Sequence, residues 1–146
     1  MDALPSAQPA DLPAIRALLT ASGLPSADLT PAHLASFWIE RDAAGLVGVV
    51  GLEPRGRAAL LRSLAVRADA RGRGLGGALL GQAEAQARAI GVETLHLLTT
   101  TAERFFAARG YAVAPRGAAP PEIQATAEFA GLCPSTSVCM RKHLST

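Results

Sequence analysis

Residues 67–80, RADARGRGLGGALL, place arginines and glycines together at the start of an apolar helical pattern. Inside a helix each glycine costs about 1 kcal/mol relative to alanine, so this composition needs another explanation. The first N–H groups of a helix have no partner within it, and the helix dipole puts partial positive charge there. Glycines let an anion approach that backbone closely, and Arg71 and Arg73 would add full charges. The stretch therefore predicts a loop that binds phosphate or pyrophosphate.

Other interpretations of this loop fit less well. A P-loop would end in a lysine followed by serine or threonine, and this loop has neither. Gly72, Gly74 and Gly77 match the dinucleotide fingerprint, which also wants an acidic residue about 20 positions on. Glu93 lies near that distance, but it opens a strand instead of ending one. An RGG-like RNA contact would bring repeats and interleaved aromatic residues, which are missing here.

The segments around the loop alternate between strand and helix patterns, which predicts an α/β chain. Asp11 is expected to cap a first helix over residues 12–19, and Thr30–Pro31 is typical of a second helix start. The remaining expected helices cover residues 74–90, 102–110 and 120–132, and the expected strands cover residues 36–41, 46–54, 59–66, 92–100, 111–115 and 135–142. The first two strands form a hairpin, and residues 58–99 form a parallel crossover around the glycine loop.

Length and composition indicate one globular domain over residues 1–146. The chain is 49% hydrophobic and 18% charged, a balance that suits a compact core and argues against disorder. A net charge of +2 gives no support for a nucleic-acid partner, and no apolar run is long enough for a membrane span. We therefore expect a cytoplasmic protein, in which Cys133 and Cys139 are buried reduced thiols.

The loop and its flanks resemble the GNAT acyltransferase superfamily. RGRGLG at residues 71–76 is similar to that superfamily's R/Q-x-x-G-x-G/A signature, and FFAARGY at 105–111 is similar to the end of its short helix. LTTTAERFFAARGY and the tail PPEIQATAEFAGLCPSTSVCMRK look like the arsenic-resistance-associated, ArsN-like N-acetyltransferases. The resemblance implies one GNAT-like domain with a mixed, mostly antiparallel sheet, a central splayed parallel pair of strands and helices on both faces.

The same resemblance implies where acetyl-CoA would bind. The pyrophosphate would lie on the glycine loop, at Arg71, Gly72, Arg73, Gly74, Gly76 and Gly77. The pantetheine arm would pair with the backbone of Leu64 and Val66, as an added strand does. The Leu64 amide would donate to the thioester carbonyl. Apart from the resemblance, the candidate contacts for the acceptor are Arg62, Ser63, Arg116 and Glu128. No metal is expected.

A proton acceptor for the amine is harder to identify. Some relatives carry a glutamate where this chain has Leu60, so Glu53, at the end of the preceding strand, is the best remaining carboxylate. An ordinary strand-end charge explains Glu53 equally well. His96, on a strand, is better explained as a core residue than as a base. Phe106 stands where many relatives have a tyrosine acid, although a thiol with a pKa near 8.5 can leave unaided.

The resulting expectation is N-acetyl transfer from acetyl-CoA to a small, amino-acid-like amine, of which arsinate and phosphinate amino acids are examples. Two alternatives stay open: acetylation of a protein N-terminus or lysine, and a non-catalytic acetyl-CoA sensor. Neither nucleic acid nor membrane is expected as a partner, and a homodimer is left open.

Overall fold

A hairpin forms one edge of the sheet. β1 (Phe37–Asp42) pairs antiparallel with β2 (Gly45–Arg55), so that Ile39 lies opposite Val49. The Asp42 carboxylate accepts the Ala44 N–H at 2.8 Å and Gly45 has φ +126°, which together close the turn. The computed structural model, which describes residues 4–144, thus confirms the predicted hairpin.

Six strands form a mixed sheet in the order β1-β2-β3-β4-β6-β5. β3 (Ala58–Val66) is parallel to β4 (Thr94–Thr99), and the paired residues run from Ala58 with Thr94 to Leu60 with His96. β6 (Val138–His143) is antiparallel to β4 and to the short β5 (Ala112–Val113). The predicted α/β class, mostly antiparallel around one parallel pair, is confirmed. The pairing of β3 with β4 involves its first three residues, and the expected splay beyond them stays a prediction.

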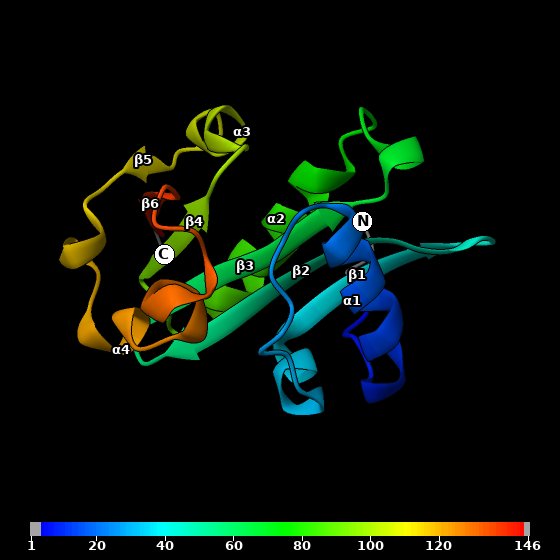
Figure 1. Cartoon of the computed structure of the whole chain (residues 1–146), viewed down its shortest axis with the longest axis horizontal. Helices are drawn as coiled ribbons and strands as arrows, with labels where there is room; N and C mark the ends of the chain where they lie inside the picture. The colour runs from blue at the N-terminus through cyan, green and yellow to red at the C-terminus, as the bar shows by residue number, and fades with distance from the viewer. Residues whose placement is uncertain (1–3, 145–146) are drawn as a thin grey trace. The chain divides into compact units, whose positions relative to one another are not determined.

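Helical segments connect these strands, and Figure 1 shows their order along the chain. The α-helices are α1 (Leu12–Ala21), α2 (Leu75–Ala89), α3 (Glu103–Ala107) and α4 (Pro121–Gln124). Shorter or irregular turns are η1 (Pro9–Asp11), η2 (Pro31–Ser36), η3 (Ala68–Ala70), η4 (Arg116–Ala118) and η5 (Glu128–Leu132). Among residues 4–144, no helix has the length and apolar character needed to cross a bilayer.

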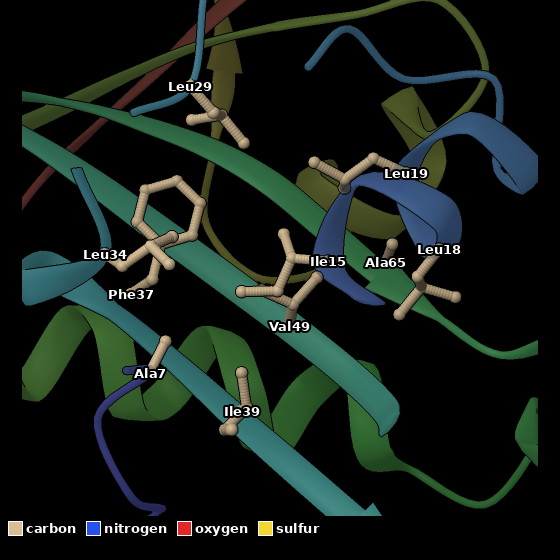
Figure 2. Packing of buried hydrophobic residues seen from close by; sticks show 10 residues of the cluster. All are labelled: Ala7, Ile15, Leu18, Leu19, Leu29, Leu34, Phe37, Ile39, Val49 and Ala65. Atoms are coloured by element: carbon tan, nitrogen blue, oxygen red, sulfur yellow. The ribbon is translucent and has the colours of Figure 1, made fainter. Parts of the chain in front are cut away.

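The chain divides into two compact units: unit 1 is Met1–Glu53 with Arg62–Gln86, and unit 2 is Pro54–Leu61 with Ala87–Thr146. In unit 1, α1 and α2 lie on opposite faces of the strands, as Figure 2 shows. Val49 belongs to the cluster under α1, whereas a Cβ at its neighbour Gly48 would lie 2.7 Å from Leu79 of α2. Adjacent strand residues point to opposite faces, which explains this division.

The core of unit 1 is the apolar cluster drawn in Figure 2. Its members, all buried, are Ala7, Ile15, Leu18, Leu19, Leu29, Leu34, Phe37, Ile39, Val49 and Ala65. Phe37 occupies space that Gly51 leaves, since a Cβ at Gly51 would lie 2.4 Å from its ring. Leu29 and Leu34 flank the start of η2, so the cluster ties the connection between α1 and β1 to the sheet.

Unit 2 has a smaller apolar cluster at the start of β3. Ala58 and Leu60 pack there against Ala119 and Ile123, with the half-buried Phe129 beside them. These contacts place the segment from η4 to η5 on the sheet face that carries the Leu60 side chain. Leu60 is paired with His96, and neighbours across a ladder share a face, so His96 lies under the same segment.

Three local expectations differ from the structure. Asp11 does not cap α1 with its side chain but accepts the Gln8 N–H and pairs with Arg41. The helix that begins at Pro31 is a short 3-10 turn. Residues 120–132 do not form one helix: α4 stops at Gln124, and the Ile123 carbonyl accepts both the N–H and the hydroxyl of Thr126, at 3.1 and 2.6 Å.

Candidate functional site

The glycine loop runs from η3 to the start of α2. Gly72 has φ +81° and Gly74 has φ +79°, a conformation that L residues rarely adopt. A Cβ at either glycine would meet nothing within 4 Å, so backbone conformation and not crowding requires glycine here. The Ala78 N–H makes the first helical bond, to the Gly74 carbonyl at 3.1 Å. The N–H groups of Gly76 and Gly77 precede any partner within α2, as the anion-binding interpretation needs.

The arginines of the loop differ in what they contact. Arg67 donates to Asp42 and Asp69, and its hydrogen bond lowers the pKa of Asp42 to about 2. Arg67 therefore holds the loop against the β1–β2 turn. Arg71 is exposed, and its Nε donates to the Val66 carbonyl at 3.0 Å, while Arg73 is also exposed. The structure brings Val66, Arg71 and the glycines together in one loop.

Ser63 interrupts the regular pleat of β3. Its φ is +59°, so it lies in the left-handed region although it is not a glycine. The Arg62 Nε donates to the Ser63 hydroxyl at 3.1 Å, a contact that adjacent residues of a regular strand, pointing to opposite faces, do not make. Ser63 thus turns both side chains to one side, just before Leu64 and Val66, the strand residues expected to bind the pantetheine arm.

Arg62 is the centre of a buried charge cluster. Its side chain is fully buried, and its Nη1 and Nη2 donate to the two carboxylate oxygens of Asp28 at 2.5 and 2.9 Å. Nη1 also donates to Oε1 of the buried Glu53 at 2.6 Å. Burial raises the pKa of Asp28, but the hydrogen bond and charge of Arg62 outweigh it, so this pKa lies below its usual value of 3.8. We call Asp28, Glu53 and Arg62 the charge cluster.

His33 lies beside the charge cluster, and sequence reasoning missed it. Its Nε2 lies 3.9 Å from Glu53 Oε1, and its side chain is 24% exposed. Its Nδ1 accepts the Thr30 N–H at 3.1 Å, which in the neutral ring leaves the proton on Nε2, toward Glu53. The signal in the sequence was the position of His33 three residues after Thr30, where a polar side chain can complete a capping box.

Asp28, His33 and Glu53 together resemble a metal site. Each offers one ligand atom, and these atoms lie within 4.8 Å of one another. Both carboxylates already accept hydrogen bonds from Arg62, so a divalent cation would have to displace a buried guanidinium. The donor set fits a structural ion-pair network better than a metal.

Arg62, a predicted acceptor contact, and Glu53, the predicted proton acceptor, lie in the charge cluster, and Ser63 contacts it through Arg62. Ser63 and Arg62 are adjacent, but the guanidinium of Arg62 is bonded to Asp28, Glu53 and Ser63 of its own chain. A further bond to an acceptor would compete with these partners. The roles of Arg62 and Ser63 in acceptor binding, and of Glu53 in proton transfer, stay predictions.

Residues interpreted as core are buried. His96 is buried, and burial and then the charge of Arg141 lower its pKa, so the ring is neutral at neutral pH. Cys133 and Cys139 are buried free thiols, and burial raises the pKa of Cys139. Tyr111 packs edge-on against Phe106, with ring centroids 5.4 Å apart.

Comparisons with solved structures place this architecture among acetyltransferases. N-acetylglutamate synthase from Neisseria gonorrhoeae, complexed with coenzyme A and N-acetyl-glutamate, has a TM-score of 0.83 and 26% identity over 98% of this chain and 35% of its own. Rv2747 from Mycobacterium tuberculosis, in complex with CoA and NLQ, has a TM-score of 0.82 and 19% identity over 99% of this chain and 100% of its own. The present chain spans about a third of the length of the gonococcal synthase chain.

A putative N-acetyltransferase from Lactobacillus plantarum is similar as well, with a TM-score of 0.68 and 25% identity over 99% of this chain and 100% of its own. No curated protein matches the chain. The family model of the acetyltransferase (GNAT) domain matches residues 33–113, more than half of the chain. That match includes the glycine loop, Ser63 and most of the charge cluster. The chain belongs to the GNAT acetyltransferase family.

Proposed function

We propose that the chain transfers an acetyl group from acetyl-CoA to the amino group of a small, amino-acid-like compound. The observation that carries this is the glycine loop inside the family match, with Gly72 and Gly74 held at positive φ and open space where their Cβ atoms would be. Two neighbours described above contain coenzyme A, and one of them also contains an acetylated amino acid.

The loop and β3 would hold acetyl-CoA. The backbone from Gly72 to Gly77 would bind the pyrophosphate, with Arg71 and Arg73 supplying charge. The Leu64 amide would donate to the thioester carbonyl, a contribution of about 3 kcal/mol when the oxygen becomes an oxyanion. Ser63 supports this assignment because its left-handed φ changes the direction of the backbone immediately before Leu64.

Acetyl-CoA supplies an activated acetyl group. The amine lone pair attacks the thioester carbon, the C–S bond breaks, and the thiolate leaves with the bonding electrons. An ammonium group must lose a proton before its nitrogen can attack, and Glu53 is our proposed acceptor. Once the C–N bond has formed, the nitrogen loses a second proton, which passes to water. Arg62 positions the Glu53 carboxylate, and His33 Nε2, which carries the proton of the neutral ring, lies 3.9 Å from Glu53 Oε1. Phe106 offers no acid, so the thiolate would leave without one.

The resemblance of the tail to ArsN-like enzymes supports arsinate or phosphinate amino acids as acceptors. A cytoplasmic location is part of the same proposal. We propose phosphinothricin as the first acceptor to test. The whole of residues 1–146 would then serve as one catalytic domain.

An amine panel tests the proposal. Release of free thiol from acetyl-CoA would be measured with phosphinothricin, glutamate, a lysine peptide and a peptide with a free N-terminus. We expect amine-dependent release, fastest with the amino-acid-like compounds. Faster release with either peptide would indicate a protein acetyltransferase. Tight acetyl-CoA binding without release on any amine would indicate a sensor, and would overturn the proposal.

A further inference from the structure

Arg116, the first residue of η4 in unit 2, has no acceptor for its guanidinium. Its Nε and Nη2 are buried, and within residues 4–144 neither has a hydrogen-bond partner. A guanidinium carries five N–H donors and keeps its charge at any physiological pH. Buried charged donors are ordinarily paired, so this side chain needs a partner from outside the described residues.

Arg62, which is fully buried, and Arg67, which is half-buried, show what such a partner looks like. Arg62 is bonded to Asp28 and Glu53, and Arg67 to Asp42 and Asp69. Each of these guanidinium groups has a carboxylate oxygen within 2.6 Å. Arg116 has no ion pair within the part of the chain that the structure describes.

An aromatic contact does not replace that partner. The Arg116 guanidinium carbon lies 5.9 Å from the Phe129 ring centroid, near the limit of a cation–π contact. Arg109 lies 3.8 Å over Phe105 and still donates Nη1 to the Phe105 carbonyl at 2.9 Å. The ring next to Arg116 can attract its charge, but it accepts none of the in-plane N–H groups of Arg116.

A second arginine acts on the same part of unit 2 as Arg116. The charge of Arg116 acts on Cys139 of β6, as does that of Arg141, two residues further along the same strand face. Burial is the larger effect on Cys139 and raises its pKa, so the thiol stays neutral. His96, paired with Arg141, is neutral as well. Two arginines beside neutral side chains favour an anion.

We infer that Arg116 binds a compact planar or tetrahedral oxyanion, a carboxylate or phosphinate, with its guanidinium fork. The fork matches two oxygens of such a group, and Arg141 adds a second charge. Phe129 and the segment around α4 bound the site on its apolar side. The inference goes beyond the proposed function, since an oxyanion can bind here whether or not the chain acetylates an amine.

The Nε–H resonance of Arg116 tests the inference directly. We would assign it by its loss in Arg116→Lys, which keeps the charge but removes the fork. Sodium acetate and sodium dimethylphosphinate would then be titrated at constant ionic strength, with chloride as the reference anion. We expect a saturable shift of the Arg116 signal with the oxyanions and none with chloride. The Arg109 signal serves as the internal control, because that group already has an acceptor.

A linear drift shared by Arg116 and Arg109, or an Arg116 signal that does not shift with either oxyanion, would overturn the inference. Neither result depends on turnover, so it is separable from a failure of the acetyltransferase proposal. A kinetic arm identifies the source of the anion by comparing alanine with ethylamine as acceptors. If the anion is the acceptor's own, Arg116→Lys reduces the KM preference for alanine about 10- to 100-fold. If the preference is unchanged while the shift persists in the native chain, the anion is a separate ligand.

Discussion

The charged guanidinium of Arg62 is buried and pairs with the carboxylates of Asp28 and Glu53. A buried ion pair adds little net stability compared with apolar residues, because desolvation offsets the attraction. Its value here is orientation, because Arg62 donates to both Asp28 and Glu53 Oε1. A carboxylate that is fixed in this way can accept a proton along a defined direction, which is what Glu53 needs if it serves the acceptor amine.

Glu53→Gln tests the proton transfer, and Asp28→Asn is its matched control. Each variant changes one carboxylate partner of Arg62 to an amide. We expect Glu53→Gln to lower kcat/KM by about 10²-fold, with acetyl-CoA binding retained. The defect should shrink at high pH, where more of the amine is already neutral. Similar pH–rate profiles for both variants would show that Glu53 acts only through Arg62.

Arg71→Ala should raise the KM for acetyl-CoA more than it lowers kcat. Arg71 would contact a phosphate far from the reacting carbon, so its loss removes binding common to ground and transition states. The salt dependence of acetyl-CoA affinity should also become weaker. Arg57→Ala removes an equal charge from an exposed position and should change neither quantity. A loss of kcat with KM intact would contradict this placement of the cofactor.

At the scale of elements, both ends of α2 carry a glycine in the same conformation. Gly74 has φ +79° and Gly91 has φ +87°, and a Cβ at either meets nothing within 4 Å. Alanine at either position should therefore cost a similar conformational energy, about 1–2 kcal/mol. Acetyl-CoA should raise the Tm of the native chain and of Gly91→Ala, but only weakly that of Gly74→Ala. Equal increases would remove the loop from the cofactor site.

The elements that the sequence predicted well are those with local causes. The hairpin follows from alternation around Asp42–Gly45, and the loop before α2 follows from glycines that only positive φ explains. The prediction of one long helix over residues 120–132 was wrong because local features of Thr126 and Gly131 interrupt it. Thr126 bonds back to Ile123, and Gly131 has φ +155°, so apolar spacing was a poor guide there.

At the scale of the whole chain, the candidate site was only partly predictable. Glu53 and Arg62 were identified separately, as a base and an acceptor contact, and not as partners. Asp28 was missed because it lies 34 residues from Arg62 along the chain, in a connection with no helical or strand pattern. His33 was missed because its capping role and its proximity to Glu53 depend on where η2 lies.

The stability of the folded chain should fall in acid partly through Asp28. Its pKa is below 3.8 when folded, so the unfolded chain binds a proton more readily. The stabilising contribution is therefore present above about pH 4 and is lost as pH falls through the folded pKa. Urea unfolding between pH 6 and pH 2.5 should show a weaker pH dependence for Asp28→Asn than for the native chain. An unchanged slope would exclude this contribution.

The left-handed φ of Ser63 has a consequence for how this strand can vary. If every amino acid were introduced at position 63 and folded variants were selected and sequenced, backbone conformation would set the outcome. Glycine, asparagine and aspartate enter the left-handed region most easily, whereas valine and isoleucine, ordinarily the best strand residues, enter it least. Position 63 would then show the amino-acid preferences of a turn, although it lies inside a strand.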